Sequence, residues 1–174
     1  MMLASTFAVN VARWSDDRNI TTGSTPARQF LKLMEEFKET CEAIECHDVA
    51  DTMDGIGDTL VVLAIILHQT GQNFHAPFQK GLDMRAAHAG LIDDPMIVLG
   101  SSLGEIAVGI AKESPITIKE GCSGVVKGLK MLCDAAAIDI NDCMSEAWEA
   151  IKDRRGVMQG GIFVKESDLP GSVQ

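Results

Sequence analysis

Apolar residues in the first third of the chain recur every three or four positions, which is the spacing of one face of an α-helix. The triplet Ser24-Thr25-Pro26 predicts where a first helix begins, because a hydroxyl can cap a helix and proline suits its first position. An apolar stripe from Phe30 to Ile44 follows at helical spacing. We therefore predict a helix that begins near Pro26 and contains this stripe.

A second helix is predicted directly after a short break at residues 46–47. Asp48 can cap it, an apolar stripe covers residues 49–67, and Gly71 lies just beyond its expected end. A connection this short favours antiparallel packing of the two helices. The chain is therefore expected to contain an antiparallel helix pair over about residues 24–71.

The rest of the chain has further helix signals and few strand signals. Residues 72–95 are expected to include a short helix and a turn at Asp93-Asp94-Pro95, without a defined role. The segments Ser102–Glu105 and Thr117–Glu120 have the pattern of capping boxes, which open helices. The helix that opens at Thr117 is expected to end near Ala137. A last helix, capped by Asn141 or Asp142, is expected to run through Ile151 and end near Gly156. From Gly160 the tail is expected to be extended or looped.

These signals together predict an all-α fold, built as a bundle of four or five main helices. The length of 174 residues favours one domain over residues 1–174, with C-terminal helices and a tail over about 101–174. The longest apolar run, residues 60–67, is too short to cross a bilayer, and five cysteines without a CxxC motif suit a reducing compartment. A cytoplasmic protein without membrane contact is expected.

Charge and composition narrow the classes of ligand. The chain has 15 basic and 25 acidic residues, a net charge of −10, and 5% aromatic residues with no tyrosine. A protein that binds nucleic-acid polymers needs a basic surface and often stacking aromatics, so that class is excluded. A small anion can still bind such a chain, but only through metal ions or a local basic cluster.

Acidic residues are concentrated on the two predicted helices, where nine fall between residues 35 and 58. Antiparallel packing can bring their acidic faces together, and the carboxylates then repel one another unless cations lie between them. The second helix is apolar on nearly all sides past Asp58, so its acids begin close to the core. Facing oxygen ligands suit Mg²⁺ or Mn²⁺, and a solvated acidic face is the alternative. The two faces contain Gln29, Lys32, Glu35, Glu36 and Glu39, and Asp51, Asp54 and Asp58.

Other metal and catalytic patterns fail in the sequence. No histidine has a glutamate three positions before it, as a di-iron bundle requires, and Asp51–Gly55 lacks the middle acid of an EF-hand loop. There is no HExxH motif, no Walker loop and no GxSxG motif. His47 is interpreted as a loop residue.

Taken in order, the acidic residues resemble the signature of the all-α nucleoside triphosphate pyrophosphohydrolases of the MazG-like superfamily, an EExxE helix followed by an ExxD helix. In this chain, Glu35-Glu36-x-x-Glu39 resembles the EExxE element. The segment Asp51-x-x-Asp54-x-x-x-Asp58 resembles the ExxD element. Gln29-x-x-Lys32 and the stretch 149–165 are similar to the phage-type members, one branch of which, MazZ, converts dGTP to dGMP. The resemblance covers about residues 11–71 and 147–168.

One position departs from the family pattern. The family has a glutamate three residues before the final aspartate, and Gly55 takes that place here. Either Asp54 substitutes for it, or the working pair is Asp51 with Asp54. An acid in the first turn of a helix stabilises the helix, because it faces the positive end of the helix dipole. This effect alone can explain why residue 51 is acidic. We therefore expect Asp54 and Asp58 to be metal ligands and Asp51 to be secondary.

The resemblance implies hydrolysis of a nucleoside triphosphate to the monophosphate and pyrophosphate, with a purine deoxynucleotide such as dGTP as the favoured substrate. It implies two or three Mg²⁺ or Mn²⁺ ions that activate the attacking water, and a carboxylate of Glu35 or Glu36 that takes its proton. It also implies a homo-oligomer, a dimer or tetramer, in the host cytoplasm if the chain is phage-encoded. The implied metal ligands are Glu35, Glu36, Glu39, Asp54, Asp58 and Asp51.

Basic residues near the two ends of the resemblance are candidates for binding phosphate. They are Lys32 and, from the C-terminal part, Lys152, Arg155 and Lys165. An equal alternative for Lys152 and Arg155 is that they favour the negative end of the last helix.

Three residues are candidates for binding the nucleobase. Trp14, expected in an N-terminal segment just before the first helix, is either a core anchor or a stacking wall for the base. Gln29 or Asn19 would then read a base edge. Two other functions stay open: a catalytically inactive helical interaction module that keeps the acidic face, and a phosphoribosyl-ATP or dUTP hydrolase on the same fold.

Overall fold

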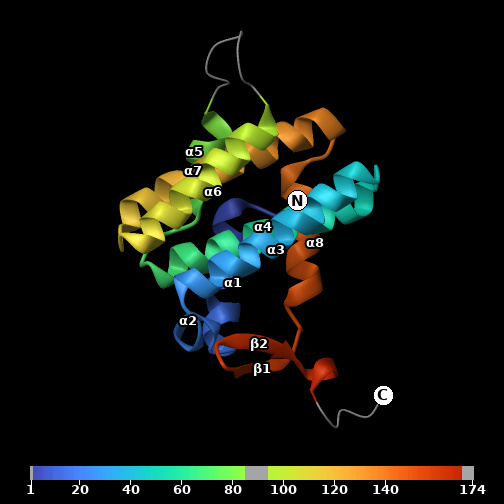
Figure 1. Ribbon diagram of the computed structural model, residues 1–174. Coiled ribbons are helices and arrows are strands. Elements are labelled where there is room, and N and C mark those ends of the chain that lie inside the picture. The colour runs from blue at the N-terminus through green and yellow to red at the C-terminus, as the bar shows by residue number, and fades with distance from the viewer. Residues whose placement is uncertain (1, 85–93, 170–174) are drawn as a thin grey trace.

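The computed structural model describes residues 2–84 and 94–169, and within them the chain forms eight α-helices and one two-stranded sheet. The mostly helical structure confirms the all-α class (Figure 1). Helices α5, α6 and α7 lie at one end of the molecule and the β-hairpin lies at the other. The elements are α1 (Ala4–Asp17), α2 (Ile20–Gly23), α3 (Pro26–Glu45), α4 (Val49–Gln69), α5 (His75–Asp83), α6 (Pro95–Ala111), α7 (Pro115–Ala136), α8 (Ile140–Ile151), β1 (Gly156–Gln159) and β2 (Ile162–Lys165).

The predicted helix pair is confirmed as α3 and α4, which pack against each other. The Thr25 hydroxyl accepts a hydrogen bond from the backbone amide of Arg28 at 3.3 Å, and the Asp48 carboxylate accepts one from that of Asp51 at 3.0 Å. Between the helices, His47 reverses the chain with a φ of 56°. Both predicted caps and the short antiparallel connection are therefore present.

Helix α4 lies at the centre of the core, and every residue from 60 to 67 is buried. Two glycines allow its neighbours to approach closely. A Cβ on Gly55 would lie 2.5 Å from the Oγ1 of Thr40 in α3, and a Cβ on Gly57 would lie 2.6 Å from the carbonyl oxygen of Cys143 in α8. The close approach of α3 at Gly55 brings the acidic faces of the two helices together.

The N-terminal segment expected before the first helix is itself a helix, α1, and this corrects the sequence prediction. Phe7, Val11 and Trp14 are buried at the i, i+4, i+7 spacing of one helical face. This pattern is obscured by other apolar residues between them, namely Ala8, Val9 and Ala12. With α1, the described part of the chain has six helices of twelve or more residues, which exceeds the expected four or five.

The capping box predicted at Ser102 is wrong, because that residue lies in the middle of α6. The helix begins at Pro95 instead, and the Asp94 carboxylate accepts a hydrogen bond from the amide of Met96 at 2.8 Å. The Ser102 hydroxyl donates to the carbonyl of Val98 at 2.7 Å, within its own helix. Of the turn predicted at 93–95, Asp93 lies outside the described residues.

The starts of the last two helices lie earlier than predicted. Helix α7 is capped by Ser114, not Thr117, and has Pro115 at its first position. Helix α8 is capped by Asp139, not Asn141 or Asp142. In both helices a short polar side chain that lies before the predicted cap accepts the hydrogen bond from a free backbone amide.

The tail expected to be extended or looped forms the hairpin of β1 and β2, in which Gly156 pairs with Lys165. Its two-residue turn consists of Gly160 and Gly161, with φ values of 58° and 84° that favour glycine. The ring of Phe163 contacts that of Trp14 on α1 at 5.8 Å between centroids. None of the helices in residues 2–84 and 94–169 is long and apolar enough to cross a membrane.

Candidate functional site

An acidic groove of about 570 Å³ lies along α3 and α4 towards the loop that joins them. All the charged residues that line it are acidic, so the groove has a strongly negative field. It ends at Glu36, which is 4% exposed and is the most buried of these carboxylates. The lining residues are Glu36, Glu39, Glu42, Ala43, Cys46, Asp48, Asp51, Asp54 and Gly55.

Lys32 forms ion pairs with two glutamates of α3 one helical turn away. Its Nζ lies 2.6 Å from the Oε1 of Glu36 and 3.2 Å from the Oε2 of Glu35. Partial burial lowers the pKa of Lys32, but the hydrogen bonds to Glu36 and Glu35 outweigh this effect and raise its pKa overall. Lys32 is thus held as a cation beside the buried carboxylate.

Burial raises the pKa of Glu36 above that of an ordinary glutamate. The ion pair with Lys32 opposes this rise, and the charges of Asp58 and Glu39 add to it. Glu36 therefore belongs to a group of like charges contributed by both helices, as the sequence predicted.

Asp58 lies half-buried on α4 and its pKa is also raised, first by burial and then by the charge of Asp54. Three cations partly offset this rise, namely Arg154, Lys32 and Lys165. We call the set of Lys32, Glu36, Asp58, Arg154 and Lys165 the mixed-charge end of the site. It joins α3, α4, the start of the hairpin and β2, which are far apart in sequence.

The three aspartates of α4 differ in their surroundings. Asp51 and Asp54 are exposed and line the acidic groove, and Asp51 lies in the first turn of the helix, where its backbone amide is capped. Asp58 is the half-buried one of the three. The departure of Gly55 from the family motif has a steric reason, since a side chain there would collide with Thr40.

The chemistry of these donors suits a hard divalent cation, because carboxylates that raise one another's pKa are stabilised by a cation between them. Their positions, however, do not form a ready metal site. Among the described residues, no three His, Cys, Asp or Glu side chains converge closely enough to hold a metal ion. Ion binding would therefore require side chains such as Glu36, now paired with Lys32, to rotate.

The predicted phosphate-binding residues divide into two groups. Lys32 and Lys165 lie at the mixed-charge end. Lys152 pairs with Glu149 on its own helix, and Arg155 lines a different hollow of about 430 Å³, between the end of α1 and the hairpin. Arg154 interacts with Asp58 and was missed by sequence analysis. Because side chains alternate along an extended chain, Arg154 and Arg155 are expected on opposite sides of it.

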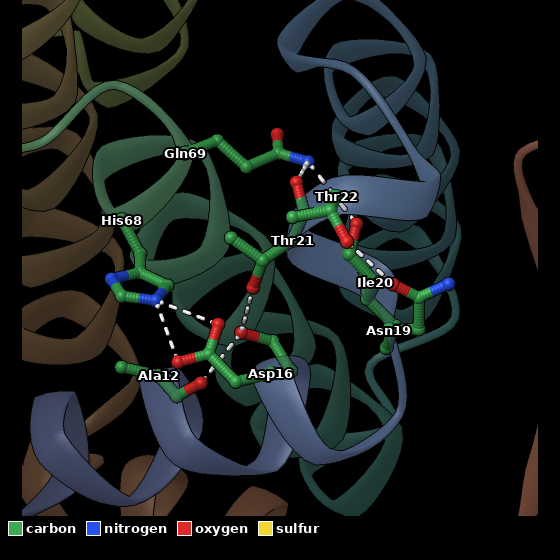
Figure 2. Close-up of polar contacts among 9 residues, drawn as sticks. Ala12, Asp16, Asn19, Ile20, Thr21, Thr22, His68 and Gln69 are labelled. Carbon is green, nitrogen blue, oxygen red and sulfur yellow. Dashed lines mark hydrogen bonds and ion pairs between the residues drawn. The ribbon is translucent and has the colours of Figure 1, made fainter.

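The predicted base-binding residues do not line the acidic groove. Trp14 is 6% exposed, its indole N–H donates to the carbonyl of Ile151 at 2.7 Å, and the Arg18 guanidinium lies over its ring. These contacts are those of a core anchor. Gln29 donates to the Ser24 hydroxyl at 3.1 Å, and Asn19 accepts from Thr22 at the start of α2 (Figure 2).

A second polar cluster, which the sequence did not predict, ties α2 to the ends of α1 and α4 (Figure 2). The imidazole of His68 lies 3.0 Å from the carboxylate of Asp16, and the amide of Gln69 donates to the carbonyl of Thr21 at 3.2 Å. A hydrogen bond from Thr21 and the contact with His68 lower the pKa of Asp16. These contacts fix α2 beside the start of α3.

The raised pKa of Asp58 predicts how stability depends on pH. Between the unfolded and the raised folded pKa the native state binds more protons than the unfolded state, so the carboxylate destabilises the fold increasingly as pH rises through that range. The stability gained by Asp58→Asn should thus grow as pH rises above about 4, the ordinary pKa of an aspartate, and level off above the raised pKa. Urea unfolding at several pH values measures this trend.

Asp139 provides a control of opposite sign, because its bonds to the amides of Asn141 lower its pKa. Asp139→Ala should lose stability that is present at neutral pH and disappears in acid. A benefit of Asp58→Asn that is the same at all pH values would contradict the burial of its charge.

Comparison with known proteins gives limited information. No protein-family model matches the chain, and no solved structure matches it. The chain is similar to an uncharacterized 18.2 kDa protein from the rep–hol intergenic region of Haemophilus phage HP1, with 43% identity over 60 residues. The match spans 34% of this chain and 37% of the phage protein, about a third of each.

Proposed function

We propose that the chain hydrolyses a nucleoside triphosphate to its monophosphate and pyrophosphate with the help of Mg²⁺ or Mn²⁺. The observation that carries this proposal is the mixed-charge end, where three cations act on half-buried Asp58 and one of them, Lys32, pairs with buried Glu36. Glu36 also lines the groove of carboxylates. The ordered acidic motif and its resemblance to the MazG-like superfamily support it.

Carboxylates from both helices would hold the cations. Glu36 and Glu39 would contribute from α3 and Asp54 and Asp58 from α4, with Glu35 and Asp51 at the margins. When bound, such ions would neutralise phosphate charge and make a water molecule more acidic. Six carboxylates line the groove, enough for more than one ion to be shared between them.

The cations of the mixed-charge end would bind the phosphate chain. Lys32 would exchange its contact with Glu36 for phosphate oxygens, and Arg154 and Lys165 would approach from the hairpin side. Arg154 offers a planar set of donors that suits phosphate, and the two lysines act as point charges. Their placement favours an elongated anion that lies between α4 and the hairpin.

Glu35 is suited to accept the proton of the attacking water. Its side chain is 55% exposed, so its carboxylate can reach solvent, whereas Glu36 is enclosed. Water attacks the α-phosphorus, the bond to the bridging oxygen breaks, and pyrophosphate leaves. The Oε2 of Glu35, now paired with Lys32, is the atom that would receive the proton.

A catalytically inactive interaction module is the second candidate function. The observation that favours it is the lack of three converging metal donors in the described part of the chain. A phosphoribosyl-ATP or dUTP hydrolase would use the same site with a different substrate.

Pyrophosphate release from a panel of substrates separates these functions. The panel should contain the four common deoxynucleoside triphosphates, dUTP and phosphoribosyl-ATP, each with Mg²⁺, with Mn²⁺ and with excess EDTA. We expect metal-dependent release that is fastest with a purine deoxynucleotide such as dGTP. No release from any substrate would support the interaction module, and full turnover in EDTA would exclude the proposed mechanism.

The placement of the basic residues predicts different effects for two lysines. Lys165→Gln should raise KM for the triphosphate by about 10-fold, because a hydrogen bond to a charged group contributes about 1.5–3 kcal/mol. Lys152→Gln, the matched control, should leave KM unchanged because Lys152 pairs with Glu149. Steady-state kinetics measure both values. A larger effect at Lys152 would place the phosphate chain on the other side of α8.

A further inference from the structure

Helix α6 is strongly apolar and yet exposed along one side. Glu105 is its one charged residue between Pro95 and Ala111. Its inner side, which includes Leu99 and Ile106, is fully buried. Because helices that are apolar all round are ordinarily buried, the outer side of α6 lacks the cover that its sequence predicts.

The outer side forms one continuous strip. We call it the α6 outer face, and its residues lie within about 60° of a line through Gly104 at 100° per residue. Ile97 is 52% exposed and Val108 is 46% exposed. A Cβ on Gly100 or Gly104 would meet nothing within 4 Å, so the residues that the structure describes do not fill the space above them. The face consists of Ile97, Gly100, Ser101, Gly104, Val108 and Ala111, all of them exposed.

We propose that the α6 outer face packs against the same face of a second copy of the chain, with the two helices antiparallel about a two-fold axis near Gly104. In this arrangement a residue before Gly104 meets the residue equally far after it in the other copy. Val108 then fits over Gly100, and Ile97 over Ala111. Large residues thus meet small ones, and small residues at the crossing let two helices approach closely.

Charges at the two ends of this edge support the same arrangement, although the exposed Glu105, on the same flank next to Gly104, would lie near its own copy at the rim. Asp94 and Lys112 are both exposed and lie on the same flank of α6, ten residues before and eight residues after Gly104. The antiparallel two-fold therefore places each Asp94 beside Lys112 of the other copy. It also places the N-terminus of each helix beside the C-terminus of the other, which the helix dipoles favour.

A second copy explains features that other occupants leave unexplained. If residues 85–93 of the same chain or an unrelated partner covered the face, there would be no reason for it to match itself in residue size and in the charges at its two ends. A parallel pair would bring Ile97 against Ile97 and lose the match of large with small. This inference does not rest on the proposed function, and its tests do not measure activity.

Sedimentation of the full-length chain tests the proposal. The unchanged chain should form dimers or larger assemblies, and Gly104→Glu should raise their dissociation constant at least 100-fold. A Cβ at this position meets nothing among the described residues, and glutamate is a better helix former than glycine, so the protomer should stay folded. The control is Ile162→Glu, an exposed site on the hairpin at the other end of the molecule, which should assemble normally (Figure 1).

Cross-linking with a short bis-maleimide tests the register. In a Cys46→Ser background, which removes an exposed thiol, Gly104→Cys should cross-link with itself. Ile97→Cys should cross-link with Ala111→Cys when the two variants are mixed, and far less with itself. The proposal is overturned by a monomeric unchanged chain, by normal assembly of Gly104→Glu, or by Ile97→Cys that prefers itself. A monomer would mean that residues 85–93 or another protein cover the face.

Discussion

Replacement of Glu36 by glutamine should lower pyrophosphate release by at least about 100-fold, the scale at which loss of one electrostatic group acts in an active site. Glu36 is the buried end of the acidic groove and interacts with charges on both helices. Glutamine keeps its size and its ability to bond with Lys32, and it removes the charge that a divalent cation would meet. Initial rates at saturating Mg²⁺ or Mn²⁺ measure the loss.

Glu42→Gln is the matched control for this variant. Glu42 lines the same groove on the same helix, but its carboxylate is exposed and pairs with Lys38 at 2.6 Å. Its activity should stay close to that of the unchanged chain. Without metal, the stability of Glu36→Gln should be equal or higher, because burial disfavours the charge of that carboxylate. A large loss of stability with activity retained would identify Glu36 as a structural residue.

Asp58→Asn should raise the metal concentration needed for half-maximal activity by about 100-fold. Loss of a residue that only supports a metal ligand already weakens metal binding by about 10–100-fold, and loss of a ligand should cost at least as much. Asp54→Asn should act in the same direction. Asp51→Asn should change it much less, because Asp51 lies in the first helical turn and has a structural reason to be acidic. Titration of activity with Mn²⁺ compares the three variants.

The same series tests the register of the motif on α4. If Asp51→Asn were the most damaging variant and Asp58→Asn were nearly neutral, the ligand pair would be Asp51 with Asp54. The cations near Asp58 would then not lie beside a metal ligand. The structure favours Asp58 because that carboxylate is half-buried and interacts with all three cations of the mixed-charge end.

The helix pair α3–α4 was predictable because its boundaries are encoded locally. Thr25 before Pro26, and Asp48 after a short break, act within a few residues of themselves. The start of α6 was equally local, yet the capping-box pattern of Ser102 and Glu105 favoured a later start, and Asp94 was interpreted as part of a turn. Helix α1 was missed because small or exposed apolar residues lie between its buried ones, so that only packing on α4 shows which face is buried.

The candidate site was predictable in part. Spacing placed Glu36 and Asp58 on facing stripes, but it could not show that Glu36 is enclosed while Glu35 beside it is exposed. Sequence also chose Arg155 over Arg154, since neighbouring positions differ only in the side of the chain that they face. That distinction depends on the pairing of Gly156 with Lys165 in the hairpin.

The position of α4 in the core has a consequence for hydrogen exchange. Amides of residues 60–67, which are buried on all sides, should exchange only when the whole domain unfolds. The ladder of β1 and β2 is short and contains no buried residue, so its amides should exchange through local opening. Asp58 and Lys165 thus belong to elements with very different opening rates. A triphosphate that binds both should slow exchange in the hairpin and leave that of α4 unchanged.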